Sequence, residues 1–231
     1  MHHTTIDPTE IAKFNHLAHD WWDKNAALKT LHDINPCRYE FIAQHINVPT
    51  CTILDVGCGG GILTETLAHN QAQVCALDAS DTLIQIAKFH AVQQGLKIEY
   101  TCAALEDYAH APFDAIVCME LLEHVCDPEK IFKHCAQLLK NGGLLFVSTI
   151  NRTIKSYLSA IIAAEYLLRI LPRQTHDYAK FIRPNEAASM ARKHGFNILD
   201  IRGIGYNPIT RKAWLTPSVA VNYLMVCNIN I

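Results

Sequence analysis

The sequence predicts an α/β protein in which helices cover both faces of a doubly wound, mostly parallel sheet. Two observations predict the parallel part: strand-like apolar runs alternate with helical segments, and a glycine-rich turn follows the first run. A third concerns the C-terminal region, where two strand-like segments, Phe196–Gly205 and Ser218–Asn228, are joined by a loop containing Asn207-Pro208. Without a helix between them, these two strands are expected to pair antiparallel.

Seven strands are expected in total. Short apolar runs between turn signals give the first five, at Cys51–Val56, Gln73–Asp78, Lys97–Thr101, Phe113–Met119 and Leu144–Thr149. Helical segments separate them, for example Ser80–Gln94, which Gly95 ends, and the segment that begins at Asp127-Pro128. Strands connected through helices run parallel and place their carboxyl ends at one edge of the sheet.

Two helix starts precede the first strand. Asp7-Pro8-Thr9-Glu10 puts an N-cap residue, a first-turn proline and a glutamate in the usual order, and the helix is expected to carry Phe14, Leu17, Trp21 and Trp22. Asn35-Pro36 is expected to begin a second helix over 38–46. The length of 231 residues suits one domain over 1–231, with N-terminal helices at 7–46 and an amphipathic insertion at about 152–182.

Charge and cysteine content indicate which kinds of partner and which cellular compartment to expect. A formal charge of −2 gives no basic surplus, so nucleic acid is not expected as a partner. The nine cysteines include no C-x-x-C pair, a usage that suits a reducing cytosol. The first residues do not form a basic and then apolar leader, and no apolar run reaches the roughly 18 residues of a membrane-spanning helix. A bacterial cytoplasmic protein is expected.

The glycine-rich turn is the most informative motif. Gly57, Gly59 and Gly61 follow the first strand and open a helix, which brings backbone N–H groups against an anionic ligand. Asp78 ends the next strand about 20 residues on, where a carboxylate accepts from ribose hydroxyls. The G-x-G-x-G spacing with Asp55 upstream differs from the dinucleotide fingerprint G-x-G-x-x-G. It resembles motif I of class I S-adenosylmethionine (SAM)-dependent methyltransferases, which have a Rossmann-like fold.

A second constellation follows the fourth strand. Glu120, Glu123 and His124 place two carboxylates and an imidazole within five residues, at the edge where parallel sheets bind ligands. Glu123 and His124 are candidates for a catalytic base, and all three for ligands of a divalent cation such as Mg²⁺. Either role suits methylation of a phenol, whose ionised form is the nucleophile; a purely structural His124 is the alternative. The backbone carbonyl of Met119 is expected to accept a hydrogen bond from the SAM ammonium.

The insertion contains an amphipathic stretch at about 152–173. Lys155 and Arg169 share a polar sector with Ser159 and Glu165, and the opposite face is apolar. Basic residues flank the stretch, which suits a helix that lies on anionic lipid. The alternative is a helix that covers the sheet or the active site, and one helix can do both.

Several segments together resemble the ubiquinone biosynthesis O-methyltransferase family over nearly the whole chain. They include Trp21-Trp22-Asp23, Leu54–Leu63, Cys118–Val125, Tyr206–Thr210 and Val221-Asn222-Tyr223. The resemblance implies SAM as methyl donor and two O-methylation steps on polyprenylated catechols. It implies contacts to SAM from Arg38, Gly57, Asp78 and the Met119 position, with Gly59 in the same loop. In eukaryotic relatives the Glu-x-x-Glu-His pattern is linked to a divalent metal; Glu120, Glu123 and His124 match it, and metal use by this chain is left open.

The function predicted from these residues is a SAM-dependent O-methyltransferase of ubiquinone biosynthesis, acting on 2-polyprenyl-6-hydroxyphenol and 3-demethylubiquinol. It is expected in the cytoplasm, in peripheral contact with the inner face of the bacterial inner membrane and with a quinone-synthesis complex. The alternatives are a methyltransferase for another small phenol, a quinone C-methyltransferase, and a SAM-binding scaffold of that complex. A nicotinamide dehydrogenase is disfavoured by the glycine spacing.

Overall fold

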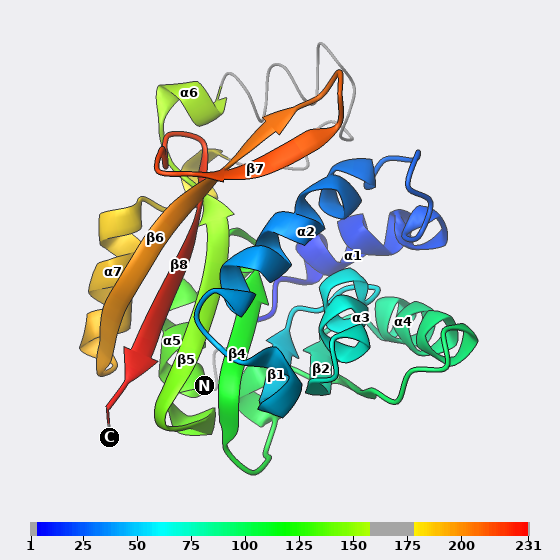
Figure 1. Cartoon of the computed structure of the whole chain (residues 1–231), viewed down its shortest axis with the longest axis horizontal. Coiled ribbons are helices and arrows are strands. Elements are labelled where there is room, and N and C mark those ends of the chain that lie inside the picture. Colours follow the sequence, from blue (N-terminus) through cyan, green and yellow to red (C-terminus); the bar gives the residue numbers. More distant parts are fainter. Residues whose placement is uncertain (1–3, 158–177, 231) are drawn as a thin grey trace.

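A single sheet of eight strands runs through the computed structural model, which describes residues 4–157 and 178–230 (Figure 1). The strands are β1 (Thr52–Val56), β2 (Gln73–Asp78), β3 (Glu99–Cys102), β4 (Phe113–Met119), β5 (Leu139–Ile150), β6 (Phe196–Asn207), β7 (Lys212–Thr216) and β8 (Asn222–Ile229). Their order is β3-β2-β1-β4-β5-β8-β6-β7. The first five pair in parallel, whereas β8 is antiparallel to β5 and β6. The mostly parallel sheet with antiparallel C-terminal strands is therefore confirmed.

The helices pack on both faces of the sheet. The α-helices are α1 (Pro8–His16), α2 (Lys29–Ala43), α3 (Ile62–His69), α4 (Asp81–Gln93), α5 (Pro128–Leu138), α6 (Ile154–Ser156) and α7 (Pro184–Lys193). The short 3₁₀ helices are η1 (Ala18–Asp20), η2 (Val48–Thr50), η3 (Leu105–Asp107), η4 (Leu122–His124) and η6 (Tyr178–Lys180). One core holds α5 and α7 against the sheet, and a second core on the other face holds α2 and α3. Alternate strand residues supply the two cores, as the pleat requires.

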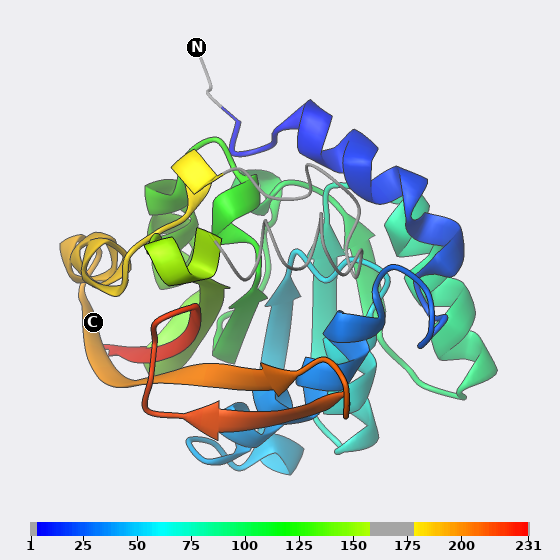
Figure 2. The same cartoon turned by 90° about the horizontal axis from the view of Figure 1, so that it is seen from above.

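The chain reverses its direction of travel across the sheet between β1 and β4. It moves outward from β1 to β2 and β3, then returns to place β4 on the other side of β1. The loops that leave β1 and β4 therefore diverge, and the carboxyl ends of these strands are left open for a ligand. Figure 2 shows these ends between α1 on one side and the β6–β7 hairpin on the other.

The strand count corrects the sequence prediction of seven. The strand expected at 218–228 is β8, which pairs antiparallel with β6 as predicted, and β7 is an additional strand within the expected connecting loop. The Asn207 side chain accepts the N–H groups of Ile209 and Thr210, so the Asn207-Pro208 turn folds β6 back onto β7. Gly205 has no side chain where the indole of Trp214 crosses it. The turn was visible in the sequence; its short partner strand was not.

The two N-terminal helices also differ from their predictions. Helix α1 ends at His16, so Trp21 and Trp22 lie in the turns that follow it rather than on its face. Helix α2 begins at Lys29, and Pro36 lies inside it. A proline there cannot donate to the preceding turn. The helix continues nonetheless because one face is buried and the Asn35 amide donates to the Thr66 hydroxyl of α3 at 2.8 Å.

The predicted amphipathic stretch lies mostly at 158–177, outside the described residues. At its edges the structure gives α6 before it and η6 after it. Within the described ranges, no helix has the length and apolar character needed to cross a membrane.

Candidate active site

A cavity of about 670 Å³ lies where the chain reverses between β1 and β4. Most of the residues predicted as site residues line it: Arg38, Gly57, Gly59, Asp78, Met119, Glu120 and His124. They come from α2, the β1–α3 loop, the ends of β2 and β4, and the segment that follows β4. The carboxyl ends of the strands thus bring together residues that are up to 86 positions apart in the sequence.

Asp78 is fixed at the end of β2 by backbone donors. Its two carboxylate oxygens accept the N–H groups of Gly59 and Ser80, each at 2.8 Å. Burial raises the pKa of Asp78, and these N–H groups oppose that rise. Asp55 lies deeper, where its carboxylate accepts from Thr64 of α3 at 2.6 Å. Both carboxylates line the cavity; backbone donors fix Asp78, whereas Asp55 also ties β1 to α3.

Trp21 lies directly over the glycine loop. A Cβ on Gly59 would meet the Trp21 ring at 2.3 Å, and one on Gly60 would meet it at the same distance. Gly59 also has a φ of +54°. Trp22 donates from its indole to the carbonyl of Gly60 at 3.0 Å and stacks on His90. The absence of side chains at Gly59 and Gly60 thus allows the segment after α1 to pack directly on the loop.

Arg38 provides buried donors that lack protein acceptors. Its guanidinium is 6% exposed, and its Nε and one terminal nitrogen make no hydrogen bond within the described residues. That terminal nitrogen is 3.5 Å from a carboxylate oxygen of Glu120. A buried N–H without an acceptor is costly, and an arginine fork suits a carboxylate. The residues present therefore fit the amino-acid end of SAM.

Glu120 and Glu123 form a pair of acids at the end of β4. Ser148 donates to Glu120 at 2.6 Å, and Thr149 donates to Glu123 at 2.7 Å. Glu123 is 3% exposed, and burial together with the charge of Glu120 raises its pKa well above the ordinary range. Glu120 has a φ of +52°, a strained backbone for a residue with a side chain. The two acids therefore have different partners on β5: Glu120 bonds to Ser148, and Glu123 bonds to Thr149.

Glu123 departs from its predicted role. It is turned to the interior against Thr149 and is not among the described residues that line the cavity. The predicted metal set of Glu120, Glu123 and His124 is not assembled either. Among described residues, the group of three donors found within 4.8 Å of one another is a different one, at Cys75. The three side chains have separate partners: His124 pairs with Glu10, Glu120 with Ser148, and Glu123 with Thr149.

His124 is paired with Glu10 of α1. Its Nδ1 is 2.9 Å from a Glu10 oxygen, and its ring lies edge-on to Phe14 at 5.0 Å. Glu10 also accepts from Lys13 and Lys180, at 3.0 and 2.9 Å. The hydrogen bond from His124 is the largest of the effects that lower the pKa of Glu10. Because an ionised Glu10 can only accept, Nδ1 carries the proton and Nε2 is the basic nitrogen.

Sequence reasoning missed Glu10, which it used only as a helix-start signal. The N-cap is confirmed, since Asp7 accepts the N–H of Thr9. Glu10 instead faces inward, and its partner His124 is 114 positions away. The segment before α1 is equally fixed: the N–H and hydroxyl of Thr5 donate to the two oxygens of Glu106, each at 2.6 Å. One signal was available in the sequence: Glu10 is followed by Ile11 and Phe14, so it lies beside the apolar face of the helix.

Comparison with known proteins agrees with this geometry. A methyltransferase domain model matches residues 23–201. The chain is 48% identical over 225 residues to a ubiquinone biosynthesis O-methyltransferase of Chromobacterium violaceum, covering 96% of this chain and 97% of that one. Its identity to the Coxiella burnetii protein of the same name is 50% over 221 residues, covering 95% and 94%. A magnesium protoporphyrin IX methyltransferase of Synechocystis PCC 6803, solved with bound SAH, shares the fold with a TM-score of 0.70 at 15% identity, covering 95% and 94%.

The fold and the cavity define a class I SAM-dependent methyltransferase. Within that class, the chain belongs to the ubiquinone biosynthesis O-methyltransferase family. Fold class, family and cofactor are therefore confirmed, whereas the roles of individual site residues stay predictions.

We expect Gly59→Ala to destabilise the protein more than Gly95→Ala. Both glycines have positive φ, at +54° and +68°, which costs an alanine about 1–2 kcal/mol. Only at Gly59 would the methyl group also collide with Trp21, since nothing lies within 4 Å of a Cβ at Gly95. Overpacking adds about 1–3 kcal/mol. Urea unfolding of both variants measures the difference, and equal losses would refute the close contact with Trp21.

We expect Glu10→Gln to lower the free energy of unfolding at pH 7 by about 1–3 kcal/mol, because a charged acceptor of three donors is lost. The pKa of Glu10 is lowered in the folded state, so its stabilising effect is complete above its ordinary value of 4.5 and declines as the pH falls below it. The gap between wild type and variant should narrow in acid.

Denaturant titrations at pH 7 and pH 4 measure this gap. Glu129→Gln is the control, because Glu129 pairs with Lys193 at the surface and should change stability little at either pH. A gap that stays constant between the two pH values would contradict an ionised Glu10 in the folded state.

Proposed function

We propose that this chain methylates a hydroxyl group of polyprenylated catechols, with SAM as the donor. The observation that carries the proposal is the joining of two sites in one cavity. Arg38 offers donors and Asp78 an acceptor for SAM beside the bare glycine loop, and the pair of His124 and Glu10 faces the same space. The family of the relatives supports the substrate class.

Each residue then has a role in holding SAM or its acceptor. Bound SAM supplies the electrophilic methyl group of its sulfonium. Arg38 would hold the methionine carboxylate, the Met119 carbonyl its ammonium group, and Asp78 the ribose. The N–H groups of Gly57, Gly59 and Gly61 already donate to the Leu77 carbonyl, Asp78 and the Cys58 carbonyl, so the bare loop would serve SAM by close approach. His124 removes the phenol proton through Nε2, while Glu10 fixes the tautomer and stabilises the imidazolium that forms. Positioning of the two reactants supplies much of the remaining rate enhancement.

The cavity walls suit a prenylated ring. Apolar side chains from α1, α2 and the strand ends surround the polar groups; they include Ile11, Phe14, Leu31, Ile34, Val125, Ile150 and Val221. Glu120 is the acidic side chain on this wall nearest to Arg38, and with His124 it offers ligands to a cation bound with a catechol. Such a cation stays a proposal, and Glu123 would join it only after a change of rotamer.

The main test is methyl transfer from labelled SAM to a short-prenyl catechol, followed by mapping of the methylated atom. We expect His124→Ala to lower kcat by about 10²–10⁴-fold with unchanged SAM affinity. Arg38→Ala should instead weaken SAM binding by about tenfold or more. Glu10→Gln should lower kcat with little change in KM or SAM affinity, and the exposed His69→Ala is the control.

The outcomes separate the alternatives. Methylation of a ring carbon would identify a quinone C-methyltransferase, and methylation of unprenylated phenols alone would identify another small phenol as substrate. SAM binding without any product would favour the scaffold. Loss of the O-methyl product on addition of EDTA would show that a divalent metal is needed, and persistence of that loss in Cys75→Ser would place that metal away from Cys75. An unchanged rate would exclude a metal role for Glu120 and His124.

We further propose that the rim of the cavity contacts a membrane that contains the substrate. Ile154 of α6 is 77% exposed, Ile209 in the β6–β7 turn 91%, and Trp214 of β7 50%. Lys155, Pro208 and Trp214 line the cavity beside them. Apolar side chains around a cavity mouth, with a lysine among them, suit an interface with anionic lipid. Arg152 is paired with Glu186 and contributes less to such a surface.

Replacement of both Ile154 and Ile209 by glutamate should abolish sedimentation with anionic liposomes, because it adds two negative charges to the apolar rim. Leu199→Glu is a matched control: Leu199 is 52% exposed near the start of β6, at the other end of that strand. Equal binding by the double variant and the control would exclude the rim as a membrane contact. Activity on a soluble short-prenyl substrate should be retained in both.

A further inference from the structure

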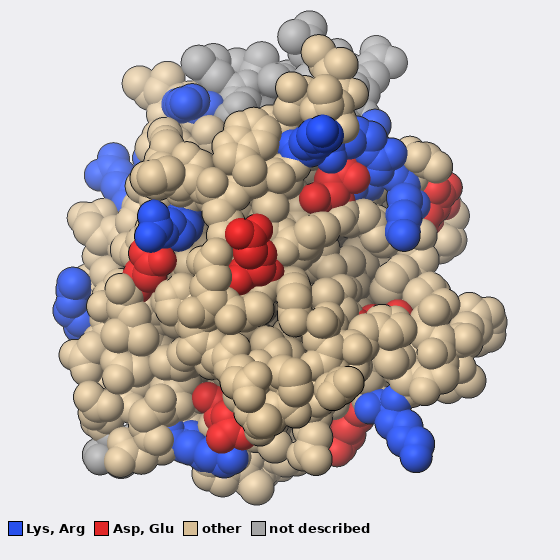
Figure 3. Space-filling view, viewed as in Figure 1, with Lys and Arg blue, Asp and Glu red and all other residues tan. Residues whose placement is uncertain are grey.

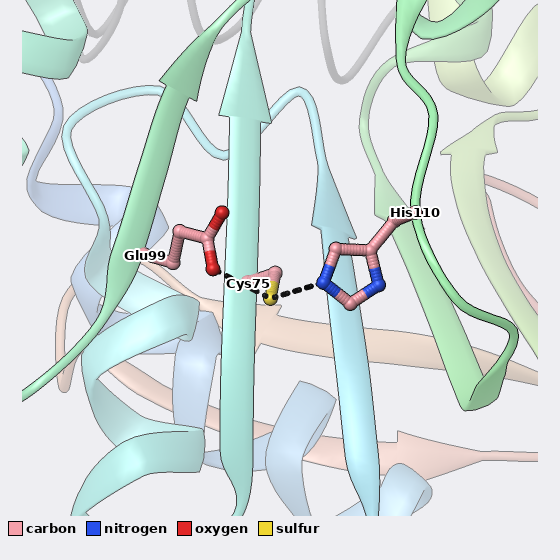
Figure 4. Close-up of side chains that lie close together, drawn as sticks. All are labelled: Cys75, Glu99 and His110. Carbon is pink, nitrogen blue, oxygen red and sulfur yellow. Dashed lines mark hydrogen bonds between the residues drawn. The ribbon is translucent and has the colours of Figure 1, made fainter.

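Three metal-binding side chain types meet on the sheet away from the cavity. Cys75 lies in β2, Glu99 is its direct neighbour in β3, and His110 comes from the loop before β4 (Figure 4). Figure 4 shows the carboxylate and the imidazole on either side of the cysteine sulfur, both directed at it. None of the three is among the described cavity-lining residues. This cluster is therefore separate from the proposed active site.

The distances suit a tetrahedral ion. The sulfur of Cys75 is 3.8 Å from Oε2 of Glu99 and 3.8 Å from Nε2 of His110, and the three ligand atoms lie within 4.8 Å of one another. With bonds of about 2.3 Å to sulfur and about 2.0–2.1 Å to nitrogen or oxygen, a tetrahedral zinc ion needs ligands about 3.5 Å apart. Small side chain rotations would close the difference.

The histidine is already oriented as a ligand. Its Nδ1 lies 2.8 Å from the carbonyl of Ala111, which can only accept, so Nδ1 carries the proton and Nε2 presents its lone pair to Cys75. The ring stacks between Tyr108 and Phe113, at 5.9 and 4.7 Å. These contacts restrict the imidazole before any ion binds, although the residue itself is exposed.

We propose that Cys75, Glu99 and His110 form a binding site for zinc or a similar borderline-soft divalent cation. Sulfur, nitrogen and oxygen donors together select zinc over magnesium, and three protein ligands leave a fourth position for water. Without the ion, burial and the charge of Glu99 raise the pKa of the Cys75 thiol, so the cluster is not an activated nucleophile. A bound cation reverses this because a coordinated thiol is deprotonated.

The bound ion would fasten the outer part of the sheet. Strand β3 is at the edge and pairs only with β2 over the described residues, and the loop that carries His110 leads back to the central strand β4. One ion would connect these three segments. With three protein ligands the site is open at its fourth position, and it lies apart from the residues assigned to methyl transfer.

The test is a zinc titration of the full chain in competition with a chromophoric chelator, with cobalt as a spectroscopic probe. We expect one tight equivalent of zinc, and a thiolate-to-cobalt charge-transfer band. Cys75→Ser should abolish the band, and both Cys75→Ser and His110→Ala should weaken zinc binding by more than about tenfold. Cys51→Ser is the matched control, a half-buried thiol outside the cluster.

Zinc affinity unchanged in both variants, or a cobalt band that survives Cys75→Ser, would overturn the proposal. Zinc should also raise the Tm of the wild type more than that of His110→Ala, since binding to the native state adds stability. Glu99 and His110 are exposed, so Glu99→Gln and His110→Ala keep the test valid should Cys75→Ser fold poorly. SAM binding by each variant verifies that it is folded.

Discussion

The close packing of Trp21 on the glycine loop after β1 is the constraint on which the rest of the site depends. Gly59 and Gly60 approach the indole so closely that a single methyl group at either position would overlap it. The same loop donates to Asp78, so the ring, the loop and the Asp78 carboxylate are positioned as one unit. The segment after α1 is thus part of the binding site, and α1 carries Glu10 to His124.

The cavity combines charges that are satisfied in very different ways. Glu10 has three donors and Asp78 has two backbone donors, whereas the guanidinium of Arg38 retains N–H groups without acceptors among the described residues. The acids are therefore held by the fold, and the arginine is held for a ligand. Such an arrangement is rigid before SAM binds, which reduces the ordering that binding must accomplish.

Local patterns in the sequence predicted what depends on neighbouring residues. Strands β1, β2 and β4, the glycine loop and Asp78 follow from apolar runs and turn residues, and their positions are confirmed within one or two residues. The features that the sequence did not predict depend on contacts between residues far apart in the chain. The pairing of Glu10 with His124 spans 114 positions, α2 continues through Pro36 because of its tertiary packing, and β7 exists only because a turn returns it to β6. The direction of the Glu123 side chain is set by a single short turn.

The anchoring of Thr5 has a practical meaning for anyone who expresses this enzyme. Thr5 is 3% exposed, bonded to Glu106, and lines the same cavity as His124. A purification tag or fusion partner joined ahead of it would be tethered close to the cavity wall. An attachment beyond β8 would lie away from the cavity, because the end of that strand is beside the amino ends of the parallel strands (Figure 1).

The space-filling view in Figure 3 shows acidic and basic side chains interspersed on the face it presents, so no single charged patch on that face would attract a charged tag.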